Sequence, residues 1–396
     1  MTIAHRHTER SRADALRASV AAARALEAQG RRIARLDIGE PHFPTPPHIV
    51  DAAHAAMRDG ATKYVSPQGL SELRHAIAAT QRARGLETTG DDVVVTPGVK
   101  PMLMYALMAV CRSGDEVLVP DPGYPGYTAA ARLAGAHVRH YPLVHTGDAF
   151  VLDLDGLRAA ITPTTHVLVI NSPQNPTGMV LDMQALEAIA EIALRHDLWV
   201  LSDEIYTALT YDGPPPPSIA TLPGMGERTI VVDGFSKAYA MTGWRLGYAI
   251  LPPRLVSAVT TLVADGSTCT PPFVQHAGVA ALTGPQTAVV EMRREYRARR
   301  NALIHQLRAI PGVRAPMPAG ALYAFAGVEA LMERGSIASS TDMASSLLHR
   351  HHVACVGGAA FGAGGERHLR LSFAVSAEQL DDALVRIAAW GSSLGA

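Results

Sequence analysis

Residues 166–201 read HVLVINSPQNPTGMVLDMQALEAIAEIALRHDLWVL, which places a helical pattern between two uninterrupted apolar runs. The runs are His166–Ile170 and Leu198–Leu201, and the helix is expected at about Met183–His196. Apolar runs without alternation are typical of parallel strands that helices cover on both faces. The stretch therefore predicts an α/β fold with a mostly parallel sheet.

The same alternation continues on both sides of this stretch. Further apolar runs stand at Val93–Val95, Glu116–Pro120, Thr229–Val232 and Arg245–Leu251, and helical patterns stand at Pro101–Arg112 and Tyr127–Leu133. After a long charged helical stretch at Gln286–Ile310, the pattern changes to a smaller α+β unit. We expect a large domain over residues 45–285 and a small domain built from residues 1–44 and 286–396, with a helix at Arg12–Ala28 packed on the latter.

The composition excludes several classes of protein. The 396 residues carry 35 Lys+Arg against 36 Asp+Glu, so the chain lacks the basic excess of proteins that coat nucleic acid or anionic membranes. No uncharged stretch contains the roughly 18 to 20 apolar residues that a membrane helix needs. We expect a soluble cytoplasmic protein without nucleic-acid or membrane partners.

Cysteine and histidine spacing points away from a metal site. Cys111, Cys269 and Cys355 are far apart and form no CxxC pair, so neither a disulfide framework nor a cysteine metal site is indicated. The pairs His5/His7 and His351/His352 lack a carboxylate or thiol at ligand spacing. We expect no metal.

Polar residues follow the apolar runs, where the carboxyl ends of parallel strands bring them to one edge of the sheet. The residues are Lys100, an Asn171–Gly178 turn with Asn175, Asp203 with Tyr206, and Lys237. Of the 35 basic residues only Lys63, Lys100 and Lys237 are lysines, so a lysine at this edge draws attention to amine chemistry.

Pyridoxal phosphate (PLP) suits this set of groups. The cofactor requires a lysine for a Schiff base, an acid at its ring nitrogen, and a cation with backbone N–H groups for its phosphate. Lys237 lies in an apolar stretch that would depress the pKa of its amine. Arg245 is expected inside an apolar strand, where a buried guanidinium needs an anion such as phosphate.

The run Ser236–Tyr248, SKAYAMTGWRLGY, resembles the lysine motif of PLP-dependent aminotransferases of fold type I, class I/II, the aspartate aminotransferase-like family. The resemblance covers almost the whole chain. Other matching stretches are IGEPHFPTP at 38–46, NPTG at 175–178, SDEIY at 202–206 and PAGALY at 318–323. It implies fold type I, in which a mostly parallel sheet forms the large domain and a smaller α+β domain stands beside it.

Matched position by position, the resemblance implies the residues of the site. The catalytic residues would be Lys237, Asp203 and Tyr206; the cofactor-binding residues would also include Gly98, Val99, Lys100, Tyr124, Asn175, Ser236, Arg245 and the partner subunit's Tyr64; the substrate-binding residues would be Gly39, Asn175 and Arg370. Because Tyr64 would serve the neighbouring site, a homodimer with composite sites is implied.

Arg370 also has support from its own strand. In HLRLSF at 368–373 the apolar residues alternate, so Arg370 lies on the opposite face from Leu369 and Leu371, where its fork suits a carboxylate. Two positions depart from the family pattern. Gly234 stands where a phosphate-binding Ser is common, and Val99 can offer only its N–H group.

The implied function is transfer of an amino group between an L-amino acid and a 2-oxo acid by a ping-pong Schiff-base mechanism. Two alternatives remain open. A PLP-dependent β-lyase, or a related lyase or synthase, uses the same scaffold. A ligand-sensing aminotransferase-like protein would need an added DNA-binding module, for which about 45 residues before the core are too few. The sequence does not specify the amino acid.

Overall fold

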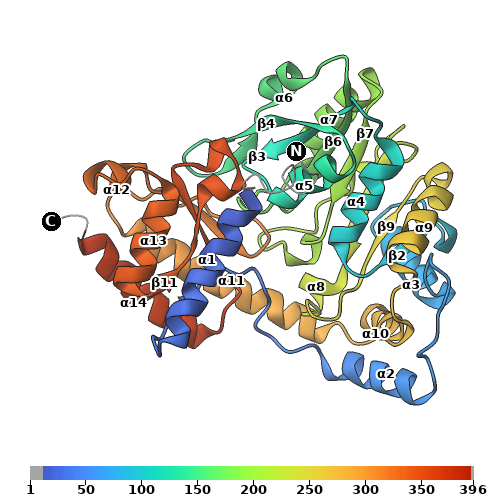
Figure 1. The fold of residues 1–396 in the computed structure, drawn as a ribbon, viewed down its shortest axis with the longest axis horizontal. Helices are drawn as coiled ribbons and strands as arrows, with labels where there is room; N and C mark the ends of the chain where they lie inside the picture. The colour runs from blue at the N-terminus through green and yellow to red at the C-terminus, as the bar shows by residue number, and fades with distance from the viewer. Residues whose placement is uncertain (1–11, 394–396) are drawn as a thin grey trace, which may run out of the picture.

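An eight-stranded sheet forms the centre of the part of the chain that the computed structural model describes, which is residues 12–393 with side chains from residue 16 (Figure 1). In order across the sheet the strands are β2 (Val93–Thr96), β9 (Gly247–Ile250), β8 (Thr229–Gly234), β7 (Trp199–Asp203), β6 (Thr165–Asn171), β3 (Glu116–Asp121), β4 (His137–His145) and β5 (Phe150–Leu152). Neighbours from β8 to β4 run parallel, whereas β9 is antiparallel to both β2 and β8, and β5 is antiparallel to β4. The predicted α/β class with a mostly parallel sheet is confirmed.

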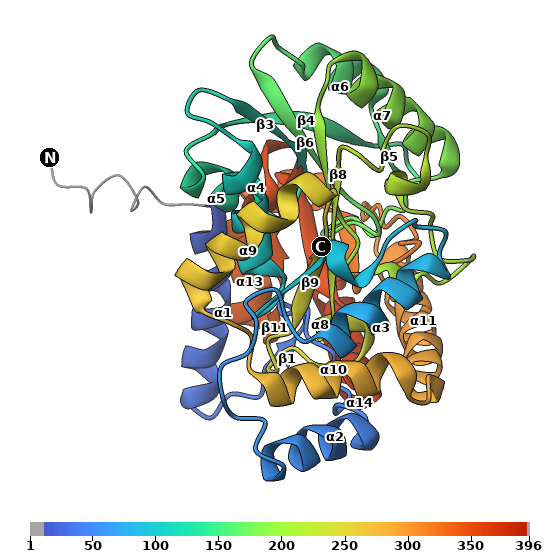
Figure 2. The ribbon, with the colours of Figure 1, turned by 90° about the vertical axis from the view of Figure 1, so that its right-hand side faces the viewer.

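Helices cover both faces of this sheet. One face is packed by α4 (Val99–Val110), α5 (Pro125–Leu133) and α9 (Pro253–Ser267). The other face is packed by α6 (Leu154–Ala160), α7 (Met183–Arg195), α3 (Ser71–Arg82) and α10 (Pro272–Thr283), with α2 (Pro47–Arg58) beside α10 (Figure 2). The strands alternate accordingly: Val94 packs on the first face, and Val93 and Val95 pack on the second.

Local sequence explains where several helices begin. Asp182 caps α7 by accepting a hydrogen bond from the Ala185 N–H at 2.8 Å. Four helices, α2, α5, α9 and α10, begin at a proline, whose fixed φ suits the first helical position and whose missing N–H costs nothing there. These signals fix where helices that cover the faces of the sheet begin.

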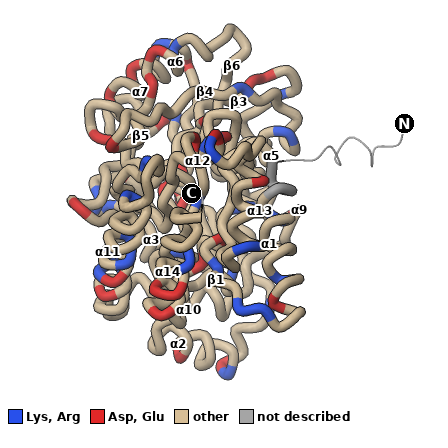
Figure 3. Tube along the Cα trace, turned by 90° about the vertical axis from the view of Figure 1, so that its left-hand side faces the viewer, with Lys and Arg blue, Asp and Glu red and all other residues tan. Residues whose placement is uncertain are grey.

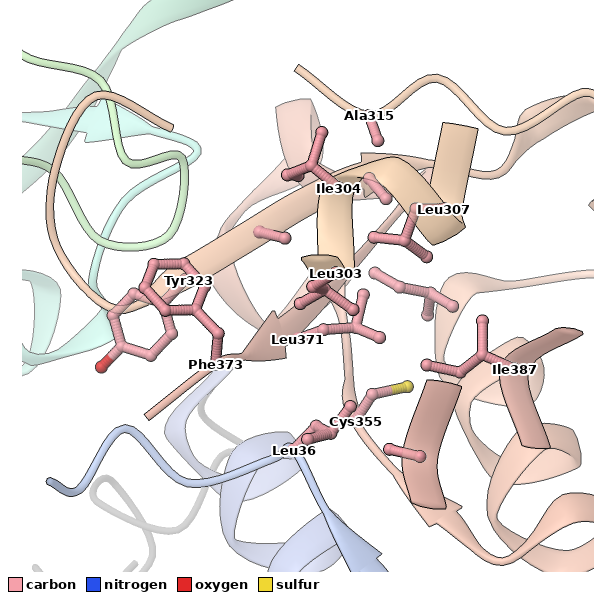
Figure 4. Packing of buried hydrophobic residues seen from close by; sticks show 14 of the residues in the cluster. Leu36, Leu303, Ile304, Leu307, Ala315, Tyr323, Cys355, Leu371, Phe373 and Ile387 are labelled. Atoms are coloured by element: carbon pink, nitrogen blue, oxygen red, sulfur yellow. The ribbon is translucent and has the colours of Figure 1, made fainter. Parts of the chain in front are cut away.

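A smaller unit flanks the sheet on one side (Figure 1). Its strands are β10 (Tyr323–Gly327), β13 (His368–Ser372) and β12 (Val356–Gly357), plus the short parallel pair β1 (Ala34–Arg35) and β11 (Val353–Ala354). Its helices are α1 (Arg12–Ala28), α11 (Thr287–Arg308), α12 (Glu329–Arg334), α13 (Ser340–His351) and α14 (Ala377–Ser393). Aliphatic side chains of α11, β13 and α14, among them Leu303, Leu371 and Ile387, form its core (Figure 4).

Two expectations need comment. The strand predicted from Arg245 begins only at Gly247, and Arg245 precedes it with a φ of 58°, so the prediction that Arg245 lies inside a strand is wrong. The division into two domains near residues 45 and 285 stays a prediction. His5 and His7 lie outside the described residues.

The surface mixes both signs of charge. Lys and Arg alternate with Asp and Glu over the face drawn in Figure 3, in keeping with the net charge of −1. Between residues 12 and 393 no helix is both long and apolar enough to cross a membrane. The same residues contain no group of three or more His, Cys, Asp or Glu that could hold a metal ion.

Candidate active site

A cavity of about 430 Å³ lies at the carboxyl ends of β6, β7 and β8 and is closed on one side by the smaller unit. Its volume is within the range of small-molecule sites, about 300–1,000 Å³. Its walls include Asn171 after β6, Asp203 after β7, Lys237 after β8, and Arg370 from β13 of the smaller unit. Groups from both units thus meet in one space.

Lys237 is held by the short helix α8 (Phe235–Ala238), which directly follows β8. Its Nζ donates a hydrogen bond to the Gly39 carbonyl oxygen at 2.7 Å. Burial lowers the pKa of Lys237, because the charged ammonium is poorly solvated there, although Tyr323 and Glu40 oppose this shift. The environment favours the uncharged, nucleophilic amine.

Asp203 ends β7 and is buried. Its Oδ2 accepts a hydrogen bond from the Tyr127 hydroxyl at 2.7 Å, and its Oδ1 accepts one from the Ile205 N–H at 3.2 Å. Burial raises the pKa of Asp203 to about 6, although both hydrogen bonds lower it. A carboxylate in this position favours a cationic partner inside the cavity.

Arg370 is also buried, with 3% of its surface exposed, so it is not a surface cation of a solvated strand. Its Nη1 donates to Asn175 Oδ1 at 3.1 Å, and its Nη2 donates to the Asp37 carbonyl at 2.7 Å. Its Nε has no hydrogen-bond partner. A buried guanidinium with an unused N–H group is suited to receive an anion.

The start of α4 is a second place whose geometry suits an anion. Gly98 precedes the helix with a φ of 89°, and no side chain caps the first N–H groups of α4. A Cβ at Gly98 would lie 2.3 Å from Arg245 Nη2, so the guanidinium lies directly over this glycine. Ser236 lines the same cavity.

The prediction that the Arg245 guanidinium is buried is also wrong. Its side chain is exposed in the single chain rather than buried, because it lies before β9. Since β9 is antiparallel to β8, the beginning of β9 lies at the edge where β8 ends. Arg245 therefore lines the cavity at the edge where β8 ends, although it precedes its own strand.

The other predicted residues are distributed as follows. All of them line the cavity except Gly98, which lies under Arg245, and Tyr64, which is 86% exposed. Tyr124 lines the cavity beside Lys100, whose Nζ lies 6.0 Å from the Tyr124 ring centroid. Gly234 pairs with Gly247, and a Cβ on Gly234 would lie 3.0 Å from the Leu246 carbonyl oxygen, so a larger residue fits poorly there.

Among the cavity residues that the sequence did not predict, three contact Asp203 or Tyr206 through their side chains. Tyr127 holds Asp203, Tyr323 contacts Tyr206, and Asn171 donates from Nδ2 to the Asp203 carbonyl oxygen at 2.9 Å. Asn171 follows β6 directly, and this position at a strand end was the available signal. The two tyrosines stand among apolar residues, which is the pattern of ordinary core aromatics.

Comparisons with known proteins agree with this architecture. Residues 31–387 match the family model described as aminotransferase class I and II. An aspartate/prephenate aminotransferase of Thermus thermophilus is 40% identical over 369 residues, covering 92% of each chain, and an aromatic-amino-acid aminotransferase 2 of Thermococcus litoralis is 38% identical, covering 90% of each. The solved structure of the Thermus thermophilus aspartate aminotransferase with maleate superposes with a TM-score of 0.88 at 39% identity, covering 95% of this chain and 96% of that one. The chain belongs to the class I and II aminotransferases, and it is an aminotransferase enzyme.

Proposed function

We propose that this aminotransferase uses pyridoxal phosphate, carried by Lys237, to exchange amino groups between an L-amino acid and a 2-oxo acid. One observation carries the proposal: a partly buried lysine, a buried carboxylate and a guanidinium with an unpartnered Nε line the same cavity. Each of these groups suits a different part of a complex between PLP and an amino acid.

The residues fit the cofactor. Asp203 would pair with the protonated ring nitrogen, and Asn175 and Tyr206 would contact the ring hydroxyl. Tyr124 would lie against the ring. The uncapped N–H groups of Val99 and Lys100, with Ser236 and Arg245, would hold the phosphate. Gly98 has a positive φ and no Cβ, so the Arg245 guanidinium has room above the start of α4.

Different residues bind the substrate and transfer its α-proton. Bound PLP supplies an electron-withdrawing ring that stabilises negative charge at the substrate Cα. Arg370 and the Gly39 backbone bind the substrate α-carboxylate, and Lys237 removes and returns the α-proton as general base and acid. Asp203 keeps a proton on the ring nitrogen.

Relatives named for aspartate, prephenate and aromatic amino acids support acidic and aromatic amino acids as the first donors to test. The cavity has apolar walls at Leu16, Val20 and Ile38 together with the cation of Lys100, so it offers surfaces for both kinds of side chain.

Assembly and location complete the proposal. The 86% exposure of Tyr64, outside the cavity of its own chain, supports a homodimer in which it serves the neighbouring phosphate site. The three cysteines form no disulfide, which supports a reducing compartment, the cytoplasm.

The test follows the near-ultraviolet and visible spectrum of the purified protein loaded with PLP. We expect a visible band that an amino acid converts to the pyridoxamine form without any 2-oxo acid present, and that a 2-oxo acid restores. Lys237→Ala should lose both the band and turnover. Pyruvate and ammonia released without this conversion would instead favour the β-lyase alternative.

A further inference from the structure

Tyr323 lies where the two halves of the candidate site meet. It begins β10 and is 2% exposed. Its ring belongs to the apolar core of the smaller unit, and its hydroxyl oxygen stands at the margin of that cluster, away from Leu303 and Leu371 (Figure 4). A phenol buried in this way normally finds a hydrogen-bond partner.

The hydroxyl reaches Tyr206. The two oxygens are 2.9 Å apart, both side chains are buried, and either oxygen can donate. The missing side chain of Gly39 makes this contact possible, because a Cβ there would lie 1.8 Å from the Tyr323 oxygen. Gly39 also accepts the hydrogen bond of Lys237, so all three residues are in immediate proximity.

The ring of Tyr323 has a separate partner. The Arg370 guanidinium carbon lies 4.2 Å from the Tyr323 ring centroid, within the range of a cation–π contact. One residue therefore contacts Tyr206 through its hydroxyl and Arg370 through its face.

We propose that Tyr323 is a positioning residue that donates its hydroxyl proton to Tyr206, and thereby directs the Tyr206 proton to the ring oxygen of the cofactor, while its ring holds Arg370 for the substrate carboxylate. The direction of the hydrogen bond follows from proton counting. Tyr206 has one hydroxyl proton, and if it donates that proton to the ring oxygen, as the proposed function on which this inference rests requires, Tyr323 must be the donor between the two phenols.

The chain of hydroxyls has a measurable consequence. A hydroxyl that accepts one hydrogen bond becomes a better donor of the next. A stronger donor stabilises negative charge on the ring oxygen, so the proton on the Lys237 nitrogen is released at lower pH. Removing the Tyr323 hydroxyl should therefore raise the pH midpoint of the visible absorption change.

The experiment compares the loaded wild-type protein with Tyr323→Phe, Tyr206→Phe and the double variant in spectroscopic pH titrations. We expect Tyr323→Phe to raise the midpoint by about half a pH unit or more, and to add no further shift in the Tyr206→Phe background. The control is Tyr211→Phe, which removes another buried phenol that donates to the Ala321 carbonyl at 2.5 Å; its midpoint should match the wild type.

Steady-state kinetics test the role of the ring. Tyr323→Phe keeps the ring and should lower kcat with little change in KM. Tyr323→Leu should also raise KM for the amino acid severalfold, because Arg370 loses one of the two aromatic rings that it contacts, Tyr323 and Phe361. An unchanged midpoint in Tyr323→Phe, or an equal shift with and without Tyr206, would overturn the inference. A wild-type protein that forms no visible band would instead refute the proposed cofactor.

Discussion

Asp203 is a carboxyl group that the fold buries without an ion pair among the described residues. Its pKa is raised to about 6 because desolvation outweighs the hydrogen bonds from Tyr127 and Ile205. In the cofactor-free protein, ionising Asp203 therefore costs stability that a cation at the ring nitrogen would restore. The carboxylate that would pair with the cofactor therefore lowers the stability of the cofactor-free protein when it is ionised.

This argument predicts how Asp203→Asn behaves without cofactor. Because the folded pKa is the higher one, the stabilising contribution is complete below the unfolded value of 3.8 and is lost as pH rises through about 6. The variant, which never ionises, should exceed the wild type in free energy of unfolding by up to about 3 kcal/mol at pH 8, and much less near pH 4. Denaturant titrations at the two pH values measure this difference. Equal effects at both would contradict the electrostatic explanation.

At the scale of elements, the apolar runs located six of the eight strands of the large sheet to within a residue or two, because strands buried on both faces must be continuously apolar. The strands β4 and β5 were not predicted, because β4 alternates between buried and exposed residues and β5 has only three residues. The polar residues after β6, β7 and β8 were predictable because the carboxyl ends of parallel strands meet at one edge of the sheet. Arg245 was misplaced because its backbone has a positive φ and β9 begins only at Gly247, and no local sequence pattern indicates that turn. Tyr127 and Tyr323 were missed because their partners are 76 and 117 residues away.

The start of α4 supports a prediction at this scale. Gly98→Ala should weaken phosphate binding and lower the free energy of unfolding by about 1–3 kcal/mol, because the new Cβ is strained at φ 89° and meets Arg245. Gly114→Ala is the matched control, since its φ is 97° and nothing lies within 4 Å of the added Cβ. Unfolding curves and PLP titrations compare the two. If both variants bind PLP alike, the contact between Gly98 and Arg245 has no role in binding.

At the scale of the whole molecule, the cavity joins segments that are far apart in the chain, from Leu16 to Arg370. The proposed dimer extends this to a second chain through Tyr64, whose exposure is otherwise unusual for a large aromatic residue.

Complementation tests the composite site. Lys237→Ala and Tyr64→Ala subunits, each impaired alone, should regain activity when mixed under conditions that exchange subunits. The hybrid dimer then has one site in which the lysine and the partner subunit's Tyr64 are both intact. The recovered activity should approach half that of the wild type per hybrid dimer. No recovery in hybrids verified by native mass spectrometry would place Tyr64 in the site of its own chain.

The hydrogen bond from Arg370 to the Asp37 carbonyl joins residues 333 positions apart. At a synthesis rate of about 5–20 residues per second, Asp37 is added to the chain roughly 17–67 seconds before Arg370. For most of that time β1 also lacks its partner β11. The part of the site that we propose binds the substrate carboxylate therefore forms only late in translation, and a chain that stops before β13 would lack Arg370.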